Sequence, residues 1–294
     1  MSATVETSSG TAYCLVCERE NPLEAILCSN CFAPMALLHD VVRQKREPCI
    51  ISVIGDSNVG KTVYLGFLLD MLSKRANDFT AVPKGAYSIS LQQTVISYLQ
   101  RRRFPPKTPN EADQWHWAYY QVSKQDHGNC WFDLIMPDMA GEALAAEVET
   151  PATVQVIQNL LGKSAGCMVL IDAAAASLGS PHPDFFGLKL MTYLDQLFTG
   201  RRGQKIRNPV AVLLCKSDYC QQCFDDPRGF VKTNLNRLWN ICESRFVNVE
   251  FFPTSIIGSL GFGHDADGNV IPVPLHIAPR GILEPFEWLL SRLQ

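Results

Sequence analysis

Eight consecutive residues early in the chain have the types and spacing of a phosphate-binding loop. Residues 55–62 are Gly-Asp-Ser-Asn-Val-Gly-Lys-Thr, which fits the pattern G-x-x-x-x-G-K-[ST] at every position. Glycines let backbone amides close on phosphate oxygens, Lys61 can reach the β- and γ-phosphates, and the Thr62 hydroxyl suits Mg²⁺. The predicted nucleotide contacts along this segment are Gly55, Asp56, Ser57, Asn58, Val59, Gly60, Lys61, Thr62 and Val63.

A second group of candidate residues stands at the end of an apolar run. Residues 131–136, Trp-Phe-Asp-Leu-Ile-Met, lead into Asp138, and Gly141 follows three residues later. A carboxylate at the end of a buried strand can hold a water on Mg²⁺, and a glycine amide at this spacing can bind a γ-phosphate. We therefore expect Asp138 and Gly141 beside the loop.

Two later segments complete an ordered set of motifs. The apolar run 210–214 leads into Cys-Lys-Ser-Asp at residues 215–218, and a further apolar run ends in Thr-Ser-Ile at residues 254–256. In this order behind the phosphate motifs, the two segments resemble the N/T-K-x-D and T-S-A motifs of the TRAFAC-class, Ras-like P-loop GTPases. The resemblance predicts GTP and GDP as ligands and Mg²⁺ as the accompanying cation.

The same resemblance implies how the base is held. Asp218 would accept hydrogen bonds from guanine, which adenine cannot donate, and Lys216 would lie along the base. Ser255 and Ile256 belong to the motif whose backbone amide would contact guanine O6. The chain departs from the family at Cys215, where Asn or Thr is usual.

The family also has a threonine that completes the Mg²⁺ shell from a mobile loop. Thr108 is our candidate because it precedes a predicted strand pair and has prolines around it, and Thr80 is the alternative. Glu142 stands where Ras has a water-orienting glutamine, so we expect Glu142 and Thr108 to serve catalysis. An anion beside the γ-phosphate predicts slow hydrolysis that a protein partner assists. The arginines at 101–103 fit a solvated helix end.

More narrowly, three segments look like the bacterial double-GTPase group. They are the P-x-K-T segment ahead of the strand pair, the D-x-A-G-E block at 138–142 and the C-terminal residues 281–290. The resemblance covers about residues 49–294 and implies a part in a bacterial conflict or regulatory system. Two alternatives stay open: a GTP-dependent scaffold that does not hydrolyse GTP, and an ATP-dependent P-loop enzyme.

The first residues of the chain carry four cysteines in two C-x-x-C pairs. This spacing suits one tetrahedral Zn²⁺ with four thiolate ligands and no open position, so we expect a structural zinc ribbon. A disulfide pair is the disfavoured alternative. The predicted zinc ligands are Cys14, Cys17, Cys28 and Cys31.

The predicted ribbon is acidic, which bears on its partners. Residues 1–40 contain one basic residue, Arg19, against five acidic residues, so nucleic acid is not expected to bind there. Four apolar side chains suggest instead that the ribbon docks on protein, either its own GTPase domain or a partner. They are Phe32, Met35, Leu37 and Leu38.

Two weaker motifs have plainer interpretations. Cys220 and Cys223 form a third C-x-x-C, but no matching pair lies nearby in the sequence, so we expect loop cysteines. Residues 265–269, Asp-Ala-Asp-Gly-Asn, start like a calcium loop, but position 12 is His276 in place of the required Glu. We expect a hairpin turn near the guanine pocket.

The elements that must position these residues follow from the apolar patterning. Short β-branched runs alternate with helical patterns from residue 49 onward, which predicts an α/β fold. We expect a three-layer P-loop NTPase sandwich, Ras-like, with a mostly parallel sheet and a small N-terminal zinc ribbon. The one predicted exception is an antiparallel hairpin of the runs 115–122 and 130–136.

The expected organisation is a disordered tail (1–10), the ribbon (11–38), a linker (39–48) and the GTPase domain (49–294). The net charge of −3 excludes a global basic field. The first ten residues lack the features of a secretory signal, and no apolar run is long enough to cross a bilayer. We therefore expect a cytoplasmic protein with protein partners, while the sequence leaves the oligomeric state open.

Overall fold

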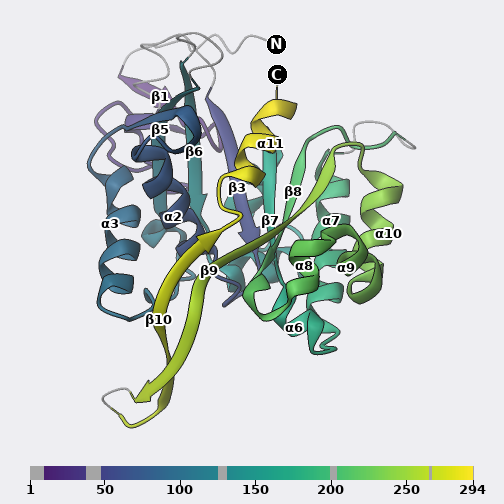
Figure 1. Cartoon of the computed structure of the whole chain (residues 1–294). Coiled ribbons are helices and arrows are strands. Elements are labelled where there is room, and N and C mark those ends of the chain that lie inside the picture. Colours follow the sequence, from purple (N-terminus) through teal and green to yellow (C-terminus); the bar gives the residue numbers. More distant parts are fainter. Residues whose placement is uncertain (1–9, 38–47, 125–130, 199–203, 265–266, 294) are drawn as a thin grey trace.

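The computed structural model describes residues 10–37, 48–124, 131–198, 204–264 and 267–293 (Figure 1). Its centre is an eight-stranded sheet in the order β10-β9-β8-β7-β3-β6-β5-β4. The strands are β3 (Cys49–Gly55), β4 (Phe79–Pro83), β5 (His116–Lys124), β6 (Trp131–Asp138), β7 (Gly166–Asp172), β8 (Val210–Cys215), β9 (Val249–His264) and β10 (Val270–Arg280).

The middle of this sheet is parallel and both of its edges are antiparallel. β3 pairs in parallel with β6 and β7, and β7, β8 and β9 continue the parallel pairing. The predicted antiparallel pairing of β5 with β6 is confirmed. It is not the single exception that we expected, because β4 with β5 and β10 with β9 are antiparallel as well.

Helices cover both faces of the sheet, which confirms the predicted three-layer α/β fold (Figure 1). The longer helices are α2 (Lys61–Ser73), α3 (Tyr87–Gln100), α4 (Gly141–Glu149), α5 (Gln155–Gly162), α7 (His182–Phe198), α9 (Pro227–Asn234), α10 (Asn236–Arg245) and α11 (Glu284–Arg292). The short turns of helix are α6 (Ala173–Ser177), α8 (Gln221–Asp225), and the 3-10 segments η1 (Ala76–Asp78), η2 (Ala112–Gln114) and η4 (Ser217–Tyr219).

The core is divided into two layers because side chains alternate along each strand. On β3, Ile51 and Val53 face the layer that contains residues of α2, α3 and α11. Ile50 and Ile54 face the other layer, which contains residues of α4, α5, α7 and α10. Continuous apolar runs in β3, β7 and β8 therefore reflect strands buried on both faces.

Several elements differ from the sequence prediction. The run 231–242 is divided at Leu235, whose non-helical backbone (φ −133°, ψ 51°) separates α9 from α10. β9 continues ten residues past Thr254, where its pairing with β8 ends, and forms a long arm with β10 (Figure 1). The arm contains several glycines on β9 and several prolines on β10, and these residues conceal the period of a strand.

The N-terminal segment folds against the sheet. β1 (Thr11–Tyr13) pairs antiparallel with β2 (Glu20–Pro22). Met35 and Leu37 are each about 1% exposed and share one apolar cluster with Trp115, Trp117 and other residues of the sheet. The ribbon thus docks on its own chain, while Phe32 stays 36% exposed.

Parts of the predicted organisation lie outside the described residues. The expected tail and linker, Leu38 and most of the loop between β5 and β6 belong to this group. Within the described part of the chain, every helix is too short or too polar to span a membrane.

Candidate functional site

The phosphate-loop motif connects a buried strand to a buried helix. β3 ends at Gly55 and α2 begins at Lys61. Two loop residues have left-handed backbone angles, Asn58 (φ 61°) and Gly60 (φ 101°), and Gly60 caps α2. Since a helix N-terminus directs free N–H groups outward, the loop and the first turn of α2 form a concave anion-binding surface. Val63 lies half-buried in that first turn.

Lys61 is a buried cation at this surface. Its side chain is 7% exposed and Nζ donates to the carbonyl oxygen of Asp56 at 2.6 Å. Burial lowers the pKa of Lys61 to about 8, although the nearby carboxylates of Asp138 and Asp56 oppose the shift. A cation in this position is poised for an anionic ligand.

Three oxygen-bearing side chains from separate segments meet next to Lys61. Asp138 Oδ1 accepts from Thr62 Oγ1 at 3.3 Å, and Asp138 Oδ2 accepts from Thr108 Oγ1 at 3.0 Å. The two threonine hydroxyls lie 2.9 Å apart. Burial raises the pKa of Asp138 despite these hydrogen bonds. The set contains only hard oxygen donors, so it fits Mg²⁺.

The alternative threonine is placed elsewhere. Thr80 lies on the edge strand β4, opposite Ser123 of β5. In the sheet order, β4 is three strands from β3, which carries the phosphate loop. Thr108, and not Thr80, is therefore the threonine that reaches Thr62.

The start of α4 closes the site from a third side. A Cβ atom on Gly141 would lie 2.5 Å from the amide nitrogen of Ser57 and 2.6 Å from Lys61 Nζ. Only glycine allows the backbone after Asp138 to approach the phosphate loop this closely. The free amides at the start of α4 therefore lie beside the loop.

Three side chains hold Glu142, and of these only Ser57 was predicted as a site residue. Its carboxylate accepts from Asn110 Nδ2 at 3.1 Å, from Lys107 Nζ at 3.3 Å and from Ser57 Oγ at 3.4 Å. The hydrogen bond from Asn110, followed by the contact with Lys107, lowers the pKa of Glu142. Lys107 is next to Thr108, so one segment contacts both Asp138 and Glu142.

The base motifs meet at the ends of β8 and β9. Ser255 is 3% exposed and its hydroxyl donates to Asp218 Oδ1 at 2.8 Å. Lys216 has a left-handed backbone (φ 59°), and its Nζ lies 2.6 Å from Asp172 Oδ2 at the end of β7. Asp172 was not predicted, because it is 44 residues from Lys216 in the sequence.

Two further residues complete the description of the base segment. Burial raises the pKa of the Cys215 thiol to about 12, so this side chain behaves as a small apolar group. Ile256 is half-buried and packs on the layer that contains α2 and α11.

The second residue of the phosphate loop has an unpredicted partner. Asp56 Oδ2 lies 2.5 Å from Nε2 of His182, the first residue of α7. The other oxygen, Oδ1, accepts from the Ser57 amide at 2.7 Å. A cavity of about 370 Å³ lies between this part of the loop, the end of β7 and α7. Asp56 therefore fixes the outer side of the loop.

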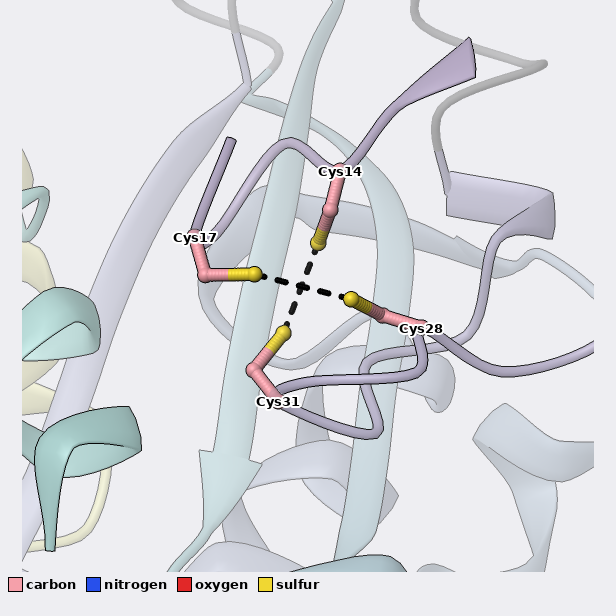
Figure 2. Close-up of side chains that lie close together, drawn as sticks. All are labelled: Cys14, Cys17, Cys28 and Cys31. Carbon is pink, nitrogen blue, oxygen red and sulfur yellow. Dashed lines mark hydrogen bonds between the residues drawn. The ribbon is translucent and has the colours of Figure 1, made fainter. Parts of the chain in front are cut away.

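The four N-terminal cysteines point toward one centre (Figure 2). All four sulfur atoms lie within 4.8 Å of one another, with Cys14 to Cys31 at 3.4 Å and Cys17 to Cys28 at 3.5 Å. Tetrahedral zinc with Zn–S bonds of about 2.3 Å requires sulfur separations of about 3.8 Å. The cluster therefore fits Zn²⁺, and within the described segments it is the one group of three or more such side chains at this spacing.

Backbone and side-chain donors surround these sulfurs. The amides of Val16 and Asn30 donate to Cys14 Sγ and Cys28 Sγ, each at 3.4 Å. Asn21, buried on β2, donates from Nδ2 to Cys28 Sγ at 3.4 Å and accepts from the Ser29 amide at 2.7 Å. Donors of this kind stabilise thiolates and orient them.

The weaker motifs form no further site in the described part of the chain. Cys220 and Cys223 join no such cluster. The turn before β10 closes the arm, as predicted, but β9 runs nine residues from Ser255 to His264 before it. At about 3.3 Å per residue this distance is about 30 Å. The predicted position of the turn, near the base motifs, is therefore wrong.

The fold and the order of the motif loops define a P-loop GTPase-type domain with an N-terminal four-cysteine ribbon. The family model of double-GTPase 1 matches residues 52–242, which is 191 of the 294 residues. The chain therefore belongs to the double-GTPase 1 family, which confirms the resemblance. No curated protein matches the chain.

Solved structures align with this chain at low identity. The S. cerevisiae Ski7 GTPase-like domain, bound to GDP and inorganic phosphate, is 16% identical over 87% of this chain and 52% of its own (TM-score 0.42). Methanosarcina barkeri Roco2 RocCORdC bound to GDP is 14% identical over 84% and 49% (TM-score 0.35). The SRb-GTP/SRX complex from Chaetomium thermophilum is 16% identical over 73% and 93% (TM-score 0.37). The chain spans about half the length of the Ski7 and Roco2 chains.

Proposed function

We propose that this chain binds Mg²⁺-GTP and GDP as a molecular switch and hydrolyses GTP slowly. The observation that carries the proposal is the convergence of Lys61, Thr62, Thr108, Asp138 and Gly141. These residues come from the phosphate loop, a second loop and the end of β6, all at the carboxyl edge of the parallel strands. Ligands of open α/β sheets bind at this edge.

In the proposed complex the phosphate loop and Lys61 bind the phosphates, while Thr62, Thr108 and Asp138 hold the cation directly or through water. Mg²⁺, when bound, neutralises phosphate charge. The amide of Gly141 donates to the γ-phosphate, so only the triphosphate joins the start of α4 to the loop. Thr108 and Gly141 are therefore the residues that distinguish GTP from GDP.

Guanine selectivity is assigned to Asp218, with Lys216 along the base and the segment at Ser255 and Ile256 on the far side. The hydrogen bond from the Ser255 hydroxyl to Asp218 Oδ1 fixes the carboxylate, and the other oxygen, Oδ2, is assigned to the base. The Lys216 contact with Asp172 holds the lysine stem in the same way. A fixed acceptor favours guanine over adenine because adenine lacks the N1 and N2 donors.

Glu142 is the residue assigned to orient the attacking water. Its charge would repel the γ-phosphate, and the contact with Lys107 offsets that charge. Lys107 and Glu142 are both largely exposed, so this offset is partly screened by solvent. We therefore expect slow hydrolysis by the chain alone. A protein partner that orders the exposed segment around Lys107 and Glu142 would accelerate it.

The remaining assignments rest on the family and on the cysteine cluster. We assign the ribbon a structural Zn²⁺ that fixes its fold, since four sulfur ligands leave no position for substrate. A cytoplasmic role in a bacterial conflict or regulatory system, with protein and not nucleic acid as partner, completes the proposal. Its support is the family resemblance and the acidic ribbon.

Single-turnover hydrolysis of γ-labelled GTP by the full chain with Mg²⁺ tests the proposal. We expect phosphate release on the order of 10⁻⁴–10⁻³ s⁻¹, as for GTPases without an activator. Glu142→Ala should slow release at least about tenfold, whereas Arg101→Ala, at the exposed end of α3, should leave it unchanged. GTP binding without any phosphate release would favour the scaffold alternative, and turnover near 1 s⁻¹ would remove the need for a partner.

A further inference from the structure

The distal arm, which we define as residues 256–264 of β9 with 270–278 of β10, is a two-stranded ribbon that extends beyond the layers of the fold (Figure 1). Neither strand segment of the arm contains Asp, Glu, Lys or Arg. Several of its apolar side chains are exposed: Phe262 (77%), Val270 (65%) and Leu275 (50%). An isolated two-stranded ribbon is marginally stable, and exposed apolar surface of this kind marks an interaction site.

The two long edges of the arm differ in their hydrogen-bonding capacity. Pro272 pairs with Phe262, and Pro274 pairs with Leu260. A hydrogen-bonded pair in an antiparallel ladder needs an N–H from each residue, and proline has none, so these are the non-hydrogen-bonded pairs. The backbone N–H positions of 272 and 274 therefore face away from β9 and lack the hydrogen, which closes the outer edge of β10 to another strand.

The outer edge of β9 is open for the same geometric reason. In the two non-hydrogen-bonded pairs, the N–H and C=O groups of Leu260 and Phe262 point away from β10. By the period of the strand, those of His264, which pairs with Val270 in the same regular register, do so as well. Among the described strands, only β8 pairs with this side of β9, and that pairing ends at Thr254. Residues 260–264 thus offer a strand edge whose outward-facing N–H and C=O groups come from every second residue.

We propose that this edge pairs with the same edge of a second copy of the chain, antiparallel across a two-fold axis. An antiparallel strand pair is self-complementary, and the absence of charge from Phe251 to His264 means that no like charges oppose each other. The result is one continuous four-stranded sheet in the order β10, β9, partner β9, partner β10.

One register brings the two apolar outward-facing residues together. It centres the axis on Gly261, so that Leu260 lies opposite Phe262 of the partner subunit. Leu260 and Phe262 then form hydrogen-bonded pairs in both directions. The exposed Phe262 ring comes beside an apolar partner, and the central pair is Gly261 with its own copy, where backbones approach most closely. This pairing is independent of the proposed nucleotide chemistry.

Disulfide trapping of the full-length protein tests the register. The Gly261→Cys variant places two thiols on Cα atoms about 4.5 Å apart, within the range that a disulfide spans. The three atoms nearest to its new Cβ all belong to the flexible side chain of Leu275, with Cδ1 at 2.9 Å. In the matched control Ser259→Cys, the two introduced cysteines, one on each strand, are offset by four residues along the strands. Their Cα atoms are therefore about 13 Å apart, which no disulfide spans. We expect mild oxidation to give a covalent dimer with Gly261→Cys and none with Ser259→Cys or the unmodified chain.

Sedimentation velocity over a range of concentrations tests the association itself. We expect a concentration-dependent dimer, and Leu260→Pro should lower the association constant at least about tenfold because it removes the outward N–H as Pro272 does on β10. Leu260→Val keeps the N–H and should keep the dimer. The proposal would be overturned by a monomer at every concentration or by equal trapping of both cysteine variants. It would also be overturned if Leu260→Pro left the association constant of the dimer unchanged. Binding of another protein's strand by a monomeric chain would overturn it as well.

Discussion

At the residue scale, the phosphate site combines a buried cation with a buried carboxylate. Burial lowers the pKa of Lys61 to about 8 and raises the pKa of Asp138, because both side chains have lost water. Each pKa shift means that the charged form of the side chain is poorly solvated when no ligand is bound. Phosphate beside Lys61 and a cation beside Asp138 would supply the missing counter-charges.

This environment predicts proton uptake on nucleotide binding. In the free protein at pH 8, about half of the Lys61 side chains are neutral, whereas a bound phosphate raises the pKa of Lys61 and keeps the side chain charged. Titration calorimetry of Mg²⁺-GDP in buffers of different ionisation enthalpy should show uptake of about 0.5 proton at pH 8 and almost none at pH 6.5. As the pH rises through 8, the affinity should fall. Equal heats in all buffers at pH 8 would contradict this assignment.

Sequence reasoning found the residues of the site that belong to local motifs. Lys61, Thr62, Asp138 and Asp218 stand at fixed spacings after apolar strands, so their types and order were sufficient. The partners that hold these side chains could not be predicted, since Lys107 and Glu142 are 35 residues apart and Asp56 and His182 are 126 apart. Such contacts depend on how the elements pack.

At the scale of elements, the four-cysteine ribbon has no core of its own, and a polar network joins its two cysteine pairs. Its strands β1 and β2 have three residues each, which is too few for independent stability. Asn21 on β2 joins the two knuckles, because it contacts Cys28, the Ser29 amide and the carbonyl of Arg19. The sequence predicted the metal ligands by spacing, but nothing in the pattern marked Asn21.

The network makes Asn21 a determinant of zinc affinity. Asn21→Ala removes a donor to the Cys28 sulfur and leaves the Ser29 amide without its acceptor, so zinc affinity should fall about 10–100-fold. Ser29→Ala keeps the amide and changes only an exposed side chain, and it serves as the control. Competition with a chromophoric chelator measures both. Equal affinities for the two variants would show that the network does not support the metal.

The elements of the sheet were predicted where apolar runs are long and buried, as in β3, β7 and β8. β4 and the arm of β9 and β10 were missed because edge strands and an exposed ribbon carry no continuous apolar pattern. On β10, Pro272 and Pro274 argue against a strand in any sequence-based analysis, yet both lie where no ladder hydrogen bond is needed.

At the scale of the whole molecule, ribbon and sheet share one core. Cys14, Cys28, Met35 and Leu37 belong to the same buried cluster as Trp115 and Trp117 next to the sheet. Lys163, just after α5, also donates to the carbonyl of Leu15 and lies 2.8 Å from Glu18. The ribbon is therefore a part of the layered fold, and its metal should affect the stability of the sheet.

Removal of the metal should consequently destabilise the nucleotide-binding part of the chain. If loss of the ribbon fold exposes its share of this cluster, the cost is about 2 kcal/mol or more, and the unfolding midpoint of the whole chain should fall by at least about 3 °C. Tryptophan fluorescence during heating, with zinc content measured on the same sample, makes the comparison. Metal-free protein that unfolds at the unchanged temperature would mean that the two parts are energetically separate.

A competition titration tests most directly the proposal that this chain selects guanine nucleotides. Labelled GDP with Mg²⁺ is displaced by GTP, ATP or xanthosine triphosphate from the unmodified chain and from Asp218→Asn. We predict that GTP competes at least about 100-fold better than ATP, and that Asp218→Asn reverses the preference from GTP to the xanthosine nucleotide. Equal or tighter binding of ATP, or a preference that Asp218→Asn leaves unchanged, would contradict the account.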